Sequence, residues 1–76
     1  MSTSKLTTYT EMARVLAALP MLVREARRAR GLSIRAAAVQ IGCSFSTVTR
    51  FERGEDCTLS NAALMLAWLD DRRPIS

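Results

Sequence analysis

The chain has 76 residues, of which 49% are hydrophobic and 24% are charged, and its formal net charge is +4. This length allows a single domain with a small core. No apolar run approaches the roughly 20 residues that a membrane-spanning helix requires, and no signal sequence precedes the first apolar segment. We therefore expect a cytoplasmic protein without a membrane partner.

The positive charge is concentrated in the first half of the chain. Residues 1–38 hold seven basic and two acidic side chains, a balance of +5, whereas residues 39–76 hold four basic and five acidic ones, a balance of −1. A basic half favours an anionic partner such as nucleic acid, although the same arginines would also suit a solvated helix face. Four of these basic residues lie close together: Arg24, Arg27, Arg28 and Arg30.

The residue types needed for catalysis or metal binding are scarce. The chain has no histidine, and Cys43 and Cys57 lack the spacing of metal ligands, so we interpret both as reduced thiols packed as small hydrophobic side chains. The sequence holds no phosphate-cradling loop and has little room for a pocket. We expect no enzymatic activity, no metal, no cofactor and no small-molecule ligand.

The N-terminal residues lack any apolar pattern. Residues 1–7 are polar and are predicted to form a flexible arm. Thr8 and Glu11 then make a T-x-x-E capping box, which predicts a helix over residues 9–18. Apolar side chains recur there at helical spacing: Met12, Val15, Leu16 and Leu19.

A proline interrupts this apolar pattern. Pro20 suits the first turn of a new helix and would kink a continuous one. We predict a break near Leu19 and a second helix over residues 20–30, which Gly31 ends. Its buried stripe would consist of Leu22, Val23, Ala26 and Ala29.

The central stretch, residues 31–54, reads GLSIRAAAVQIGCSFSTVTRFERG. Ser33 and Ser44 are each suited to cap the start of a helix, because a serine hydroxyl accepts a bond from an unpaired backbone N–H. Gly42 ends the first of these helices and Gly54 the second, at positions where glycine adopts a left-handed conformation easily. Two helices with so short a connection form a helix-turn-helix.

The last part of the chain predicts one more helix and a frayed tail. Thr58 or Ser60 would cap an apolar helix that runs to Asp70, and residues 71–76 are charged and contain a proline. The predicted core-facing stripe of this helix, with Trp68 at its edge, is Leu59, Ala63, Leu66, Ala67 and Leu69.

The central stretch resembles the helix-turn-helix of the lambda repressor/Cro (XRE-type) DNA-binding family, and the chain looks like a small phage-type regulator of this family. The matching residues follow one another without a gap: Gly31, Leu32, Ser33, Ala38, Gly42, Ser44, Ser46, Thr47, Arg50, Glu52, Arg53 and Gly54. The resemblance implies an all-α fold, a compact bundle of about five short helices. It places a single domain over residues 8–70, with its motif at residues 33–53.

The resemblance also implies an ion pair. In this family, an arginine before the motif pairs with a glutamate near the end of the second motif helix, and those positions are Arg27 and Glu52 here. Such a pair fixes geometry more than it adds net stability. Two positions depart from the family pattern, because Ile34 replaces a glutamine and Ala37 replaces a core leucine.

The helix over residues 44–53 would read DNA bases. Phe45, Ser46, Thr49 and Arg50 share one side of it. Arg50 can bond O6 and N7 of guanine, or alternatively a phosphate. Phe45 can contact a thymine methyl group, or alternatively cover the turn between the helices.

Phosphate contacts are expected at the helix N-termini, where backbone N–H groups point outwards. The expected phosphate-binding residues are Ser33, Arg35, Thr47 and Arg53. Many family members carry basic residues in the loop after the motif, whereas this chain has Glu55 and Asp56, which predicts fewer phosphate contacts on that side.

These features favour a phage-type, sequence-specific transcriptional regulator in the bacterial cytoplasm or nucleoid. The family implies a homodimer on a pseudo-palindromic operator. The additional N-terminal helix would form the dimer contact, or else a C-terminal surface of Met65, Trp68, Leu69 and Ile75. Two alternatives are an antitoxin that regulates its own gene through the same motif, and a helical interaction module that does not bind DNA.

Overall fold

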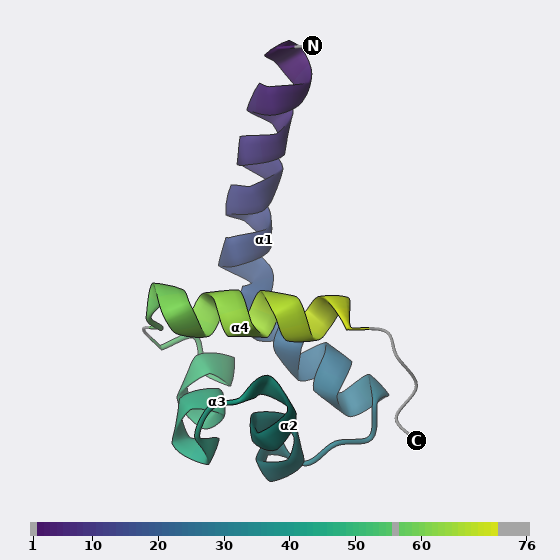
Figure 1. Cartoon of the computed structure of the whole chain (residues 1–76), viewed down its shortest axis with the longest axis vertical. Helices are drawn as coiled ribbons and strands as arrows, with labels where there is room; N and C mark the ends of the chain where they lie inside the picture. Colours follow the sequence, from purple (N-terminus) through teal and green to yellow (C-terminus); the bar gives the residue numbers. More distant parts are fainter. Residues whose placement is uncertain (1, 56, 72–76) are drawn as a thin grey trace.

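The computed structural model describes residues 2–55 and 57–71, with side chains from Thr8 onward. Within these ranges the chain is all-helical and has no strand. The four helices are α1 (Ser2–Ala29), α2 (Ile34–Ile41), α3 (Phe45–Glu52) and α4 (Leu59–Asp70). The N-terminal half of α1 rises on one side of α4, and α2 and α3 lie on the other side (Figure 1).

Helix α1 is continuous through Pro20. The predicted break near Leu19 is therefore wrong, and the described residues form four helices instead of about five. A proline inside a helix removes one backbone hydrogen bond and costs about 3 kcal/mol, usually with a kink. Figure 1 shows that α1 changes direction where it passes behind α4. Leu19 and Val23 are both fully buried, so core packing on either side of the proline offsets this cost.

Helix α1 also begins earlier than the capping box predicted. Its first helical residue is Ser2, so the segment expected to be a flexible arm is helical from there, and Met1 lies outside the described residues. The sequence before Thr8 contains neither glycine nor proline, and nothing in it stops a helix from extending backwards.

The core draws side chains from every helix. Helix α1 packs against α3 and α4, and α2 packs against the same two helices. Ala37 is fully buried although it replaces the leucine typical of the resembling family. The buried apolar residues are Leu19, Val23, Ala37, Ala38, Ile41, Val48, Phe51, Met65 and Trp68.

Helix α4 turns a different face to the core than the sequence predicted. Met65 and Trp68 are buried, whereas Leu59 is 85% exposed and Leu66 is also exposed. Nearly every side of α4 is apolar, so the spacing of its residues does not identify the buried side. Met65 and Trp68 therefore cannot form the proposed C-terminal dimer surface, and Ile75 lies outside the described residues.

Arg30 joins the end of α1 to the end of α4. Its guanidinium lies 4.3 Å from the centre of the Trp68 ring and donates to the backbone carbonyls of Trp68, Leu69 and Asp71, each at 3.2 Å. These carbonyls carry the partial negative charge of a helix C-terminus, which a cation stabilises. The indole N–H of Trp68 donates to Gln40 of α2 at 3.0 Å. These polar bonds explain why Trp68 lies inside the bundle and not at its edge.

Candidate nucleic-acid interface

Both motif helices begin at the serines that the sequence predicted. The Ser33 hydroxyl accepts from the backbone N–H of Ala36 at 3.0 Å, and the Ser44 hydroxyl accepts from that of Thr47 at 3.1 Å. Gly42 ends α2 with a φ of +94°, in the left-handed region that favours glycine. These two N-caps and the left-handed Gly42 confirm the predicted start of each motif helix and the predicted end of α2.

The two sides of α3 differ sharply. Val48 and Phe51 are buried in the core, which fixes the rotation of the helix about its axis. The opposite side carries a shallow hollow in the surface. The four residues that the sequence predicted to read bases line this hollow together: Phe45, Ser46, Thr49 and Arg50.

The polar groups of the hollow have different hydrogen-bonding capacity. The Thr49 hydroxyl donates to the backbone carbonyl of Phe45 at 3.0 Å, so its hydrogen is already used and its oxygen is left as an acceptor. Arg50 is exposed and brings donors only, in the planar fork that matches two acceptors of guanine. The hollow therefore offers donors, an acceptor and an apolar ring at separate points.

An ion pair holds α3 to α1. Arg27 donates from Nε to one carboxylate oxygen of Glu52 at 2.8 Å and from Nη2 to the other at 3.1 Å, and its Nη1 donates to the carbonyl of Leu32 at 3.0 Å. The hydrogen bonds to Glu52 raise the pKa of Arg27, so its charge is retained at any ordinary pH. These are the two residues that the resemblance paired. Three bonds from one guanidinium fix the angle between the last turn of α3 and α1.

The predicted phosphate-binding residues do not all lie at one end of the motif. Ser33 and Ser44 cap the first turns of α2 and α3, and the hydroxyls of Ser44 and Thr47 share a hydrogen bond of 2.8 Å. Arg53 lies at the opposite end of α3, where it forms an exposed ion pair with Glu55 at 3.8 Å. Arg53 is not among the residues that line the hollow, and Glu55 offsets part of its charge.

One contact between the two motif helices was not predicted from the sequence. The guanidinium of Arg35, in the first turn of α2, lies 5.1 Å from the centre of the Phe45 ring at the start of α3. Phe45 remains 45% exposed, so the stack leaves ring surface available. The sequence held a partial signal, because a helix-turn-helix brings these two helices close together, but the stacking depends on side-chain geometry that spacing does not reveal.

The two cysteines are free thiols, as predicted, but only Cys43 packs against the core; Cys57 is exposed, so the prediction that it packs as a small hydrophobic side chain is wrong. Burial raises the pKa of the Cys43 thiol, with a smaller contribution from the negative charge that Cys57 would carry. Partial loss of hydration raises the pKa of the Cys57 thiol as well, although the residue as a whole is exposed. Within the described residues, no three side chains of the metal-binding types come together as a metal site.

A family model for a helix-turn-helix domain matches residues 18–66, which is well over half of the chain. The chain therefore belongs to this helix-turn-helix family, whose fold suggests a DNA-binding regulator. Comparison with curated proteins gives no match, and comparison with solved structures gives none either. Among the described residues, no helix is both long and apolar enough to cross a membrane.

Proposed function

We propose that this chain is a sequence-specific regulator of transcription, of the phage repressor or Cro type, that reads the major groove of double-stranded DNA with α3. One observation carries the proposal: the four side chains suited to base contacts share one exposed hollow on α3. The core and the Arg27–Glu52 ion pair hold the other side of the helix. A helix fixed in this way can enter a groove with little loss of side-chain and backbone freedom.

Each residue of the hollow has a distinct role in the proposed reading. Arg50 bonds O6 and N7 of a guanine, and the ring of Phe45 packs on a thymine methyl group. Ser46 donates or accepts, whereas Thr49 accepts, because its hydrogen is bound to the Phe45 carbonyl. These roles predict that α3 reads one guanine and one thymine in each half-site.

The phosphate contacts position α3 in the groove. Ser33, Arg35 and Thr47 lie in or beside the first turns of α2 and α3, where backbone N–H groups add a partial positive charge. Arg53 binds a phosphate at the far end of α3 more weakly, because Glu55 competes for its guanidinium. These contacts are salt-sensitive and carry no sequence information themselves.

A homodimer on a pseudo-palindromic operator completes the proposal. One helix-turn-helix contacts only a few base pairs, and two copies related by a twofold axis read inverted half-sites about 10 base pairs apart. Occupying the operator in the bacterial cytoplasm would exclude the polymerase from the promoter. No catalytic step and no bound cofactor are part of this account.

Selection from a pool of random duplexes tests the proposal and does not require the operator sequence in advance. We expect enrichment of one motif made of two inverted half-sites, each holding a guanine that Arg50→Ala no longer selects. Enrichment of no motif over the input pool at low salt would contradict the proposal.

A further inference from the structure

A single apolar seam runs along α1 in alternating steps of three and four residues. Its members are Tyr9, Met12, Leu16, Leu19 and Val23. Leu19 and Val23 are buried in the core, whereas Tyr9, Met12 and Leu16 are 67%, 53% and 46% exposed. A three-four spacing is the one with which helices pack along each other. The lower part of the seam therefore has its partners in this bundle, and the upper part faces outwards.

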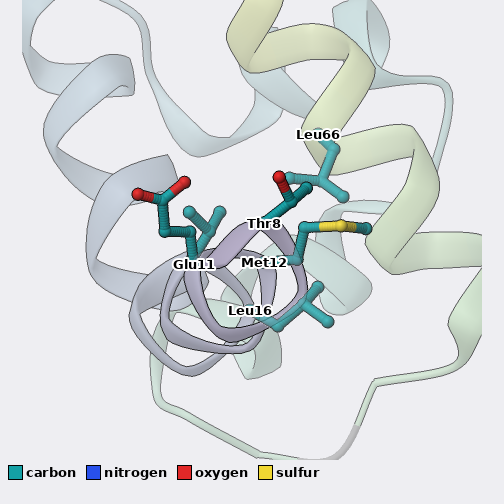
Figure 2. A pocket seen from close by; sticks show the side chains of 6 residues that line it. Thr8, Glu11, Met12, Leu16 and Leu66 are labelled. Atoms are coloured by element: carbon teal, nitrogen blue, oxygen red, sulfur yellow. The ribbon is translucent and has the colours of Figure 1, made fainter. Parts of the chain in front are cut away.

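The exposed part of the seam lies beside an apolar groove between α1 and α4. Figure 2 shows Thr8 and Met12 of α1 on the side that faces Leu66 of α4. The residues that line the groove are Thr8, Glu11, Met12, Val15, Leu16 and Leu66.

We propose that a second copy of this chain occupies this groove, with the two α1 helices packed antiparallel and crossing at Met12. A three-four seam is complementary to another seam of the same spacing, and α1 of a second copy carries one. With Met12 on the twofold axis, Tyr9 of each copy faces Leu16 of the other, because these residues lie three and four positions from the centre. Such a contact is self-complementary and closes as a dimer.

The charges beside the seam suit pairing between identical helices. In a homodimer, a charged residue beside the seam lies close to the same residue, or to an adjacent one, of the other copy. Uncharged residues at these positions avoid repulsion between like charges. The positions directly beside the seam here are Thr8, Ala13 and Val15, all uncharged, and the charged residue that lines the groove, Glu11, lies one position further from the seam. Arg14 lies on the opposite side of the helix from the seam, since it is two residues from Met12 and Leu16.

The exposure of the N-terminal half of α1 also favours a second copy. Every side chain from Thr8 to Ala17 is exposed, and an isolated helical segment of this length is marginally stable in water. Tyr9, Met12, Leu16 and Leu66 leave apolar surface exposed beside the groove, and a second copy would cover it. Packing two such helices together stabilises both.

The proposed contact leaves the DNA-reading face free. The N-terminal half of α1 and helix α3 lie on opposite sides of α4 (Figure 1). The inference gives the proposed homodimer its surface and rests on the proposed function for its biological role. The association itself is measured without DNA, so the two proposals fail independently.

Sedimentation equilibrium of the full chain without DNA tests the surface. We expect a dimer for the wild type and a dimer dissociation constant at least about 100-fold higher for Met12→Glu, because two carboxylates would meet on the twofold axis. The matched control is Leu59→Glu, at an exposed leucine of α4 outside the groove, which we expect to dimerise like the wild type. A monomeric wild type, or equal effects of the two variants, would overturn the proposal.

A cross-linking experiment reads the geometry directly. In a Cys43→Ala, Cys57→Ser background, Met12→Cys should form a disulfide-linked dimer under a mild oxidant, and Arg14→Cys should not. Equal cross-linking at both positions would refute the antiparallel seam, whatever the effect of Met12→Glu on folding. If the chain stays monomeric and still binds its selected DNA, the proposed dimer surface is refuted and the proposed DNA-binding function is retained.

Discussion

Glu52 belongs to the last turn of the helix that would enter DNA, yet its carboxylate faces Arg27 of α1. Both side chains are largely buried, and each compensates a charge that the other would leave in a poorly solvated place. The resemblance could predict this pair because both positions belong to a familiar motif. The additional bond from Arg27 to the Leu32 carbonyl could not be predicted, since it depends on the path of the backbone between α1 and α2.

Removing the charge of Glu52 should destabilise the domain. Glu52→Gln leaves the Arg27 guanidinium without its counter-charge, and we expect the free energy of unfolding to fall by about 2–4 kcal/mol. Glu55→Gln is the matched control, because Glu55 is exposed and its ion pair with Arg53 is long; its effect should stay within about 0.5 kcal/mol. Urea denaturation of both variants measures the difference, and similar values for the two would show that the Arg27–Glu52 pair is not a structural anchor.

Phe45 should make the affinity for DNA depend on a single thymine methyl group. If its ring packs on a thymine, replacing that thymine with uracil removes one methyl, worth about 0.8 kcal/mol or about fourfold in affinity for each half-site. Phe45→Ala should bind the thymine and uracil duplexes equally. A titration of the selected operator against its uracil forms measures this, and an unchanged uracil penalty in Phe45→Ala would assign the ring to covering the turn.

At the scale of helices, features that depend on neighbouring residues were predicted more accurately than features that depend on tertiary contacts. The caps at Ser33 and Ser44 involve neighbouring residues only, and both are present. The continuity of α1 through Pro20 depends on core packing around the proline, and the buried side of α4 depends on which partners Trp68 finds in other helices. The Arg35–Phe45 stack likewise joins two helices, so it too lay beyond what residue spacing could predict.

Gly42 supplies a test at this scale, because it sets the turn between α2 and α3. A Cβ there would meet no atom within 4 Å, so substitution costs backbone conformational energy alone at its φ of +94°. We expect Gly42→Ala to lower the free energy of unfolding by about 1–2 kcal/mol and Gly42→Asn to cost less, because asparagine tolerates the left-handed region. Thermal denaturation compares the two variants. Equal costs would indicate that the turn relaxes into another conformation.

On the scale of the whole molecule, the two proposed surfaces belong to helices that lie on opposite sides of α4. Helix α3 lies on one side of α4, and the uncovered seam of α1 rises on the other (Figure 1). In the proposed dimer, the two copies of α3 would have to reach half-sites about 34 Å apart. We therefore expect the spacing of the operator half-sites to depend on the proposed dimer contact, and the choice of bases to depend on α3.

The most direct measurement of the central claim is the binding of wild type, Arg50→Ala and Arg14→Ala to the selected operator and to a scrambled duplex, across a series of salt concentrations. Arg14→Ala is the control, because it removes one exposed positive charge from the projecting half of α1. We expect the wild type and Arg14→Ala to prefer the operator. Arg50→Ala should lose that preference, at a cost of about 1–3 kcal/mol, and keep its salt-dependent binding to both duplexes. Absence of binding to either duplex by the wild type at low salt would contradict the account, and would make the motif a structural element of a helical interaction module.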